Sequence, residues 1–170
     1  MLVVVSDTHG IEDARLHGRT GTAVREAECV IHAGDFTTGA VLDSIDDATR
    51  KLHAVHGNAD DPAVRARLPA TRTVEYAGVR IAITHRRDGG ETGLSLFGRE
   101  RDATLVVSGH THQPTVVDSE GVTLLNPGSH AQPRGNRPAH AELSPTDNGL
   151  DGELRQPDGT LIESFTVSKQ

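Results

Sequence analysis

The sequence predicts one α/β domain over residues 1–170, with two β-sheets flanked by helices. Three observations support this fold class. Short apolar runs recur from the N-terminus, and helical patterns lie between several of them. Many of these runs end in a Gly or a polar residue. The later part of the chain changes to strand-like segments separated by Gly, Asp and Pro turns.

Five apolar runs predict strands that are buried on both faces, because continuous apolar runs bounded by Gly are typical of such strands. They cover residues 2–5, 29–32, 52–55, 79–83 and 104–107. In open α/β sheets, ligands bind beyond the carboxyl ends of the strands. The residues that follow each run are therefore the first candidates for a site.

Helices are predicted between these runs. The clearest covers residues 38–50, where Val41, Leu42 and Ile45 share one face and Thr37 or Thr38 is the N-cap. Three shorter helices are predicted over residues 22–28, 63–68 and 93–101. For the second, Pro62 occupies the first helical position and Asp60 or Asp61 is the cap; for the third, the cap is Thr92.

The later chain predicts strands within residues 116–117, 122–125, 140–143, 152–155 and 161–167. The sequence Pro157-Asp158-Gly159 is a strong turn signal between the last two. Closely spaced strands with short turns favour hairpins, so we expect these segments to form a second, more antiparallel sheet.

Composition excludes several classes of function. The net charge of -7 argues against tight binding to a phosphate backbone, which needs clustered Lys and Arg. Aromatic residues, on which single-stranded bases stack, make up 2% of the chain. The single cysteine, Cys29, excludes an internal disulfide, and the first apolar run is too short for a signal peptide or membrane span. We therefore expect a cytoplasmic protein with no membrane association and no stable nucleic-acid complex.

Five short polar islands follow the first five runs and supply two Asp, one Asn and four His. These residues are Asp7, His9, Asp35, Asn58, His85, His110 and His112. One such island alone is usually a solvated turn, but five at successive strand ends are hard to explain in that way. The set is large enough to hold two divalent metal ions, a device that hydrolyses phosphate esters.

The residue types suit this chemistry. Asp7 and His9 are two residues apart, as are His110 and His112, so each pair can point to one side of an extended strand exit. The two oxygens of the Asp35 carboxylate could bridge two ions. The amide oxygen of Asn58 is a ligand that hard cations accept.

With these islands in order, the chain resembles the calcineurin-like metallophosphoesterase superfamily, and within it the small YfcE-type archaeal and bacterial phosphodiesterases. The family pattern is D-x-H, G-D, G-N, a His after a strand, G-H-x-H and N-P-G-S, which here ends at Asn126-Pro127-Gly128-Ser129. The resemblance covers residues 1 to about 130. It implies a four-layer α-β-β-α sandwich of two mixed sheets flanked by helices, the metallophosphoesterase fold.

The resemblance also implies the ligand set. One metal takes Asp7, His9 and His112, the other takes Asn58, His85 and His110, and Asp35 bridges them. A hydroxide between the ions is the implied nucleophile, so Asp35, Asn58 and His110 are assigned catalytic roles. Imidazole favours transition metals, so Mn²⁺ is expected first, with Ni²⁺, Fe²⁺, Zn²⁺ or Mg²⁺ as alternatives.

Two positions depart from the family pattern. Many members have His or Cys after the Asn, where this chain has Ala59, whose side chain cannot donate a proton. Loss of a general acid lowers the rate by ~10²–10⁴ for a poor leaving group. His56 could substitute, although a supporting or strand role is the simpler interpretation.

The second departure follows His85, where Arg86 and Arg87 replace the usual Gly. A guanidinium group matches phosphate oxygens, so Arg86 is a candidate substrate contact. The simpler interpretation is a solvated loop paired with nearby acidic residues. Ser129, in the N-P-G-S turn, is a second candidate contact, although a structural role is the safer assignment.

The sequence therefore predicts a metal-dependent phosphodiesterase that acts on small phosphodiesters or nucleotide-like esters. The alternative is a catalytically weak binding scaffold like the retromer subunit of the same fold family, which Ala59 favours and the complete ligand set opposes. A nuclease is a third interpretation, opposed by the acidic charge. Exposed strand edges in the later chain could pair, so a homodimer or homotetramer is expected.

Overall fold

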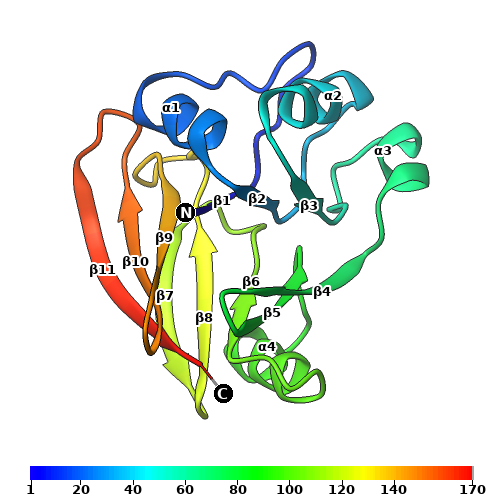
Figure 1. Ribbon diagram of the computed structural model, residues 1–170. Coiled ribbons are helices and arrows are strands. Elements are labelled where there is room, and N and C mark those ends of the chain that lie inside the picture. The colour runs from blue at the N-terminus through cyan, green and yellow to red at the C-terminus, as the bar shows by residue number, and fades with distance from the viewer. Residues whose placement is uncertain (170) are drawn as a thin grey trace.

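The computed structural model describes residues 1–169 and places two mixed β-sheets face to face between two layers of helices (Figure 1). This arrangement confirms the predicted four-layer α-β-β-α sandwich. The apolar runs at the start of the chain form three parallel strands at one end of the first sheet, and the runs from the middle of the chain form parallel strands inside the other.

The first sheet has six strands in the order β11-β10-β9-β1-β2-β3. The strands β1, β2 and β3 are parallel, and β9, β10 and β11 extend the sheet antiparallel from β1. Their bounds are β1 Leu2–Val5, β2 Cys29–His32, β3 Leu52–Ala54, β9 His140–Thr146, β10 Gly149–Arg155 and β11 Leu161–Ser168.

The second sheet has five strands in the order β4-β5-β6-β8-β7. The strands β5, β6 and β8 are parallel, whereas β4 and β7 are antiparallel edge strands. Their bounds are β4 Thr71–Tyr76, β5 Val79–Thr84, β6 Leu105–Val107, β7 Pro114–Ser119 and β8 Val122–Pro127.

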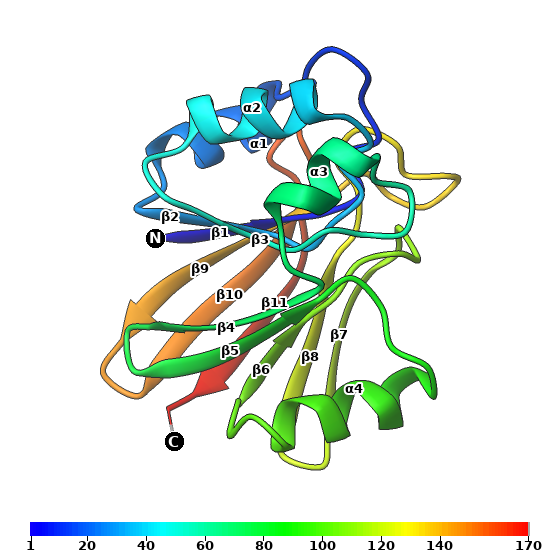
Figure 2. The same cartoon turned by 90° about the vertical axis from the view of Figure 1, so that its right-hand side faces the viewer.

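Four helices cover the outer faces of the sheets. Helices α1 (Gly18–Glu26), α2 (Gly39–Ala48) and α3 (Pro62–Arg67) lie beside the first sheet, and α4 (Gly90–Arg99) covers the second (Figure 2). Within residues 1–169, no helix is long and apolar enough to span a membrane.

The alternation of side chains along the central strands explains the four layers. Leu2 and Val4 of β1 point into the core between the sheets, and Val3 points to the opposite face, against α1. In β6, Leu105 lies in the same inter-sheet core, while Val106 packs against Phe97 of α4. Because successive residues of a strand face opposite sides, a fully apolar strand must be covered on both faces.

The expectation of a separate antiparallel sheet in the later chain is wrong. Strands β7 and β8 join the second sheet beside β6, and β9 to β11 join the first sheet beside β1. Both groups are hairpins, but each extends a sheet that earlier strands begin. Residues 71–76, for which we predicted no strand, form the edge strand β4 because they pair along their full length with β5.

Helix positions were predicted with mixed success. Thr38 caps α2 as predicted, through its Oγ1 and the N–H of Val41 (3.4 Å), and Asp61 rather than Asp60 caps α3. The predictions for the other two helices are wrong at their starts. Helix α1 begins at Gly18, and α4 begins after Gly89, whose φ of 89° makes the turn, instead of after Thr92.

A buried polar network joins α1 to β9. The guanidinium group of Arg19 donates to both carboxylate oxygens of Glu142, and Glu142 Oε1 also lies 2.9 Å from Nε2 of His140. On the other side of the ring, His140 Nδ1 lies 2.8 Å from the hydroxyl group of Thr20. Burial would raise the pKa of Glu142, but hydrogen bonds from His140 and Arg19 lower it to about 2.

We predict that Glu142→Gln destabilises the fold in a pH-dependent way. The folded pKa of Glu142 lies below the ordinary value of 4.5, so its contribution is fully present above that pH and is lost as the pH falls toward 2. The variant should lose about 1–2 kcal/mol at pH 7 and less at pH 3.5.

Urea unfolding of both proteins at the two pH values measures this difference. The control is Glu153→Gln, which removes a more exposed partner of Arg155 and should change stability by less than about 0.5 kcal/mol. Equal losses for Glu142→Gln at pH 7 and pH 3.5 would show that the carboxylate charge is unimportant.

Candidate metal centre

The seven predicted ligand residues follow the carboxyl ends of five parallel strands, β1, β2, β3, β5 and β6. Backbone hydrogen bonds hold the first two loops against each other: the N–H of Asp7 donates to the carbonyl of Gly34, and that of His9 donates to the carbonyl of Asp35, both at 3.0 Å. The N–H of Gly109 donates to the carbonyl of His85, also at 3.0 Å. The structure brings all seven side chains together.

The first group contains Asp7, His9 and His112. Oδ1 of Asp7 lies 3.8 Å from Nε2 of His9 and 3.4 Å from Nε2 of His112. The two imidazole rings stack with their centroids 4.9 Å apart. The N–H of His110 donates to both oxygens of Asp7, at 3.1 Å to Oδ1 and 3.0 Å to Oδ2, and the Ser6 hydroxyl donates to Oδ2.

The second group contains Asn58, His85 and His110, which meet at a single amide oxygen. Oδ1 of Asn58 lies 3.0 Å from Nε2 of His85 and 2.9 Å from Nδ1 of His110. The two rings meet edge to face. One oxygen and two imidazole nitrogens at this separation form a second set of donor atoms.

Asp35 lies between the two groups. Its Oδ2 is 3.4 Å from Nε2 of His9 and 3.2 Å from Nε2 of His85. Its other oxygen, Oδ1, accepts a hydrogen bond from the N–H of Ala59 at 2.8 Å. One carboxylate oxygen therefore faces a histidine of each group, which is the geometry that a bridging ligand needs.

The backbone of these loops is strained. Five of the seven residues have a positive φ: 54° at Asp7, 44° at His9, 61° at Asp35, 74° at His110 and 59° at His112. The left-handed region is sparsely populated by residues other than Gly and costs of order 1 kcal/mol or more at each position. These five residues all belong to the two groups of ligand side chains and to the carboxylate between them.

The donor atoms of this structure fit divalent metal ions. Within the described chain, Nε2 of His9 and Nε2 of His112 are buried and have no hydrogen-bond partner. A buried polar atom without a partner is unfavourable and is rare in folded proteins. Carboxylate, amide and imidazole donors together match the preferences of Mn²⁺ and neighbouring transition metals.

Hydrogen bonds behind the histidines orient their rings. Nδ1 of His85 lies 2.8 Å from the carbonyl oxygen of Ala33, and Nδ1 of His112 bonds to the carbonyl oxygen of Gln132. A carbonyl oxygen only accepts, so Nδ1 must donate in both rings. When the rings are neutral, each Nε2 presents its lone pair to the centre, which is the usual arrangement behind metal-binding histidines.

Asp60 supports the candidate site, whereas the sequence predicted it only as an alternative N-cap of α3. Its carboxylate is buried and accepts three backbone N–H groups: Asp35 at 3.0 Å, Thr37 at 2.7 Å and Gly57 at 2.6 Å. It thereby joins the loops that carry Asp35 and Asn58. Nothing in the adjacent pair Asp60-Asp61 distinguishes this role from capping, so the sequence alone could not reveal it.

His32, the last residue of β2, bonds to the loops that follow β1 and β2. Its Nε2 lies 2.9 Å from the hydroxyl of Thr8, and its Nδ1 accepts the N–H of Gly34 at 3.1 Å. The ring stacks on Phe36, with centroids 3.6 Å apart. Its burial lowers the pKa of His32 well below the ordinary value, so the ring is neutral at pH 7.

The N-P-G-S turn also supports the centre. The hydroxyl of Ser129 donates to the carbonyl of Asp7 (2.7 Å) and accepts the N–H of Gln132 (2.8 Å). Ser129 is fully buried, so its placement favours the structural role over the predicted substrate contact. Asn126 donates to the carbonyl of Gly109 at 2.8 Å and thereby holds the G-H-x-H loop.

The remaining predicted residues, Arg86 and His56, belong to neither donor group. Arg86 is exposed, lines a pocket together with His85 and His110, and pairs with Asp88 at 3.5 Å. His56 is half-buried, and its Nδ1 lies 3.4 Å from the carbonyl of Gly57. The roles of Arg86 in substrate binding and of His56 in catalysis stay predictions.

The acidity of Asp35 follows from its surroundings. Burial would raise the pKa of its carboxyl group, but the hydrogen bond and charge of His85, the N–H of Ala59 and the charge of His9 lower it to about 2. The carboxylate is therefore ionised at every pH at which the protein would be used, as a ligand must be.

A two-sheet sandwich with these donor atoms beyond its strand ends is typical of metal-binding phosphoesterases. The sequence profile of the calcineurin-like phosphoesterase superfamily domain matches residues 1–149, and the chain belongs to this superfamily. It is 32% identical to a probable metallophosphoesterase of Methanothermobacter thermautotrophicus over 173 residues, which cover 99% of each chain. This membership confirms the resemblance that the motifs indicated.

The chain is also similar to two proteins at lower sequence identity. It is 24% identical to the phosphodiesterase YfcE of Escherichia coli over 138 residues, which cover 78% of this chain and 72% of the other. Among solved structures, wild-type Vps29 of Entamoeba histolytica complexed with Zn²⁺ superposes with a TM-score of 0.78 at 21% identity, covering 97% of this chain and 98% of the other. The second likeness concerns the fold alone.

We predict that Asp60→Asn weakens metal binding, because an amide cannot accept all three backbone N–H groups. The affinity for Mn²⁺, measured by isothermal titration calorimetry, should fall about 10–100-fold. Asp61→Asn is the matched control: it changes the neighbouring cap of α3, whose side chain accepts the N–H of Val64, and should leave Mn²⁺ affinity unchanged. Equal affinities for the two variants would contradict the role of Asp60.

A second prediction concerns the number of ions. His112→Ala removes a donor of the first group and His110→Ala a donor of the second, so each variant should bind one Mn²⁺ tightly where the unaltered protein binds two. Asp35→Asn should weaken both ions. Metal analysis after dialysis measures the ratio, and a ratio of one in the unaltered protein would contradict a two-metal site.

Proposed function

We propose that this protein is a metal-dependent phosphodiesterase with two divalent metal ions, Mn²⁺ being the first candidate. The observation that carries the proposal is Oδ2 of Asp35, which lies 3.4 Å from a histidine of one donor group and 3.2 Å from a histidine of the other. Membership of the calcineurin-like phosphoesterase superfamily supports a phosphoesterase, and the name of the relative YfcE supports the diester.

Each donor group has its own role in this proposal. Asp7, His9 and His112 hold one ion, Asn58, His85 and His110 hold the other, and Asp35 is shared. Ions bound by these residues would supply two effects: they would lower the pKa of a bound water molecule, and they would offset charge on the phosphate oxygens. The nucleophile that the resemblance implies would be a hydroxide derived from that water molecule.

The protein residues perform the remaining tasks. The ionised Asp35, held by the N–H of Ala59, keeps its charge between the donor groups. Arg86 lies at the rim, where its guanidinium group can meet a phosphate oxygen. The methyl side chain of Ala59 gives no proton to the leaving oxygen, so activated aryl esters should be hydrolysed much faster than alkyl esters.

The proposal extends to the surroundings of the reaction. The substrate is a small phosphodiester or a nucleotide-like ester, the protein acts in the cytoplasm, and it forms no stable complex with nucleic acid or membrane. A homodimer or homotetramer is proposed because β11 and β7 are open sheet edges.

The alternative is a catalytically weak scaffold that binds other proteins, like the retromer subunit of this fold family. The fold likeness to Vps29 and the alanine at position 59 favour it. Because that Vps29 structure contains Zn²⁺, metal binding alone does not separate the two functions. Turnover does.

Hydrolysis of bis-p-nitrophenyl phosphate by metal-stripped protein, with and without Mn²⁺, tests the proposal. We expect turnover that requires Mn²⁺ and is lost in Asp35→Asn. Absence of turnover with Mn²⁺, Ni²⁺ and Zn²⁺, despite bound metal, would exclude a diesterase and favour the scaffold.

We also predict that Ala59→His improves the hydrolysis of poor leaving groups. Residue 59 is exposed beside Asn58, so an imidazole can be added there without displacing core residues. The rate for methyl phenyl phosphate should rise at least about 10-fold, and that for methyl p-nitrophenyl phosphate much less. Ala59→Gln, which adds bulk without a comparable acid, is the control. Equal gains for both substrates, or for both variants, would contradict a missing general acid.

A further inference from the structure

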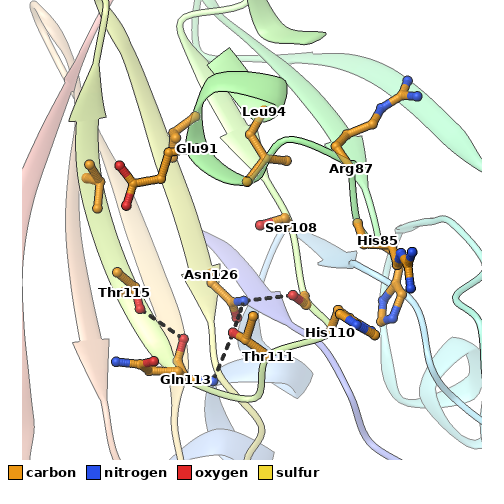
Figure 3. A pocket seen from close by; sticks show the side chains of 15 residues that line it. His85, Arg87, Glu91, Leu94, Ser108, His110, Thr111, Gln113, Thr115 and Asn126 are labelled. Carbon is orange, nitrogen blue, oxygen red and sulfur yellow. Dashed lines mark hydrogen bonds between the residues drawn. The ribbon is translucent and has the colours of Figure 1, made fainter. Parts of the chain in front are cut away.

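A hollow opens directly beside the second donor group. Its volume is about 390 Å³, within the range of small-molecule sites, and His85 and His110 form its inner end (Figure 3). The first donor group borders a different hollow, of about 380 Å³, through His9. A phosphate at the metal centre therefore has two chemically different spaces beside it, which suits a diester with two unlike ester groups.

The hollow beside His85 has an apolar floor. Leu124 of β8 is buried, and Val117 of β7 and Leu94 of α4 are half-buried and lie over it. Leu94 and Val117 pack at the edge of the cluster that contains Leu124, so the floor is a continuation of the core beneath α4. Aliphatic side chains of this kind pack against the flat face of a base.

Polar groups with free hydrogen-bonding capacity occupy the wall away from the metal centre. Glu91, in the first turn of α4, turns its carboxylate into the hollow, and Gln113 lies below it (Figure 3). Other polar groups here are already used: Asn126 donates to Gly109 and to Thr111. The guanidinium of Arg87 lies 4.3 Å from the Phe97 ring centre and points away from the hollow (Figure 3).

We propose that this hollow binds the nucleoside of a nucleotide ester, with a base that carries an exocyclic amino group. The ligand enters phosphate first, toward His85 and His110, and its base lies on Leu94, Val117 and Leu124. The Glu91 carboxylate accepts the amino group of the base, and the Gln113 amide meets the adjacent edge, pairings that proteins use to read cytosine and adenine. This inference rests on the proposed function, because it takes the metal centre as the phosphate site.

Binding measurements on the Mn²⁺-loaded protein test the proposal without requiring turnover. Isothermal titration calorimetry with inorganic phosphate, cytidine 5′-monophosphate and uridine 5′-monophosphate separates the phosphate from the base. We expect cytidine monophosphate to bind at least about 10-fold more tightly than phosphate, and about 5-fold more tightly than uridine monophosphate, which has a carbonyl in place of the amino group.

Two variants locate the effect. Glu91→Ala should abolish the preference for cytidine, while Glu100→Ala, the same change at the other end of α4, should retain it. Val117→Trp should fill the hollow, reduce nucleotide affinity to that of phosphate and leave phosphate affinity unchanged. Circular dichroism confirms that the variants fold.

The outcomes separate this inference from the proposed function. Equal affinities for phosphate and both nucleotides overturn the inference, whether or not bis-p-nitrophenyl phosphate is hydrolysed. A nucleotide preference that survives both Val117→Trp and Glu91→Ala also overturns it, because the base then binds elsewhere. Nucleotide selectivity in a protein that hydrolyses no diester would support the hollow and reject the enzyme.

Discussion

The carboxylate of Asp35 is the group on which the candidate site depends. One oxygen faces a histidine of each donor group, and the other accepts the N–H of Ala59. The N–H of Asp35 itself is held by Asp60, which also holds Gly57. One oxygen of Asp35 can face both donor groups only if the loops after β2 and β3 keep their relative positions, because the other oxygen is bonded to the N–H of Ala59. The buried Asp60 provides that constraint.

Backbone strain and burial are concentrated at the same place. Asp7, Asp35 and His112 are almost completely buried and also have left-handed backbone conformations. Each property alone is unfavourable for such residues. The strained, buried conformations persist because hydrogen bonds hold each loop. Ser129 bonds to the backbone of Asp7, His32 bonds to the loops after β1 and β2, and Asn126 bonds to the loop after β6. Strain of this kind is typical of functional sites, where it preorganises ligand groups.

The two-sheet architecture explains how residues 103 positions apart in sequence meet. Parallel strands direct their carboxyl ends to one edge, and the inter-sheet core of Leu2, Val4, Leu105 and Val107 holds the edges of the two sheets together. The backbone N–H of His110 donates to Asp7 across that boundary. The same arrangement leaves the hollow between α4 and β7 open at the second donor group. The same packing of the two sheets therefore positions the core, the candidate metal site and the hollow.

The sequence by itself determined the elements whose signal is local. Apolar runs identified the strands β1, β2, β3, β5 and β6, Thr38 and Pro62 marked two helix starts, and the polar islands named all seven residues that the structure brings together. Only the tertiary structure decided which sheet the later strands join, because a hairpin pairs with whichever edge is open to it. The same holds for β4, for the role of Asp60 and for the burial of Ser129. The sheet position of a strand, the role of Asp60 and the burial of Ser129 all depend on contacts with residues elsewhere in the chain. Composition and periodicity do not reveal such contacts.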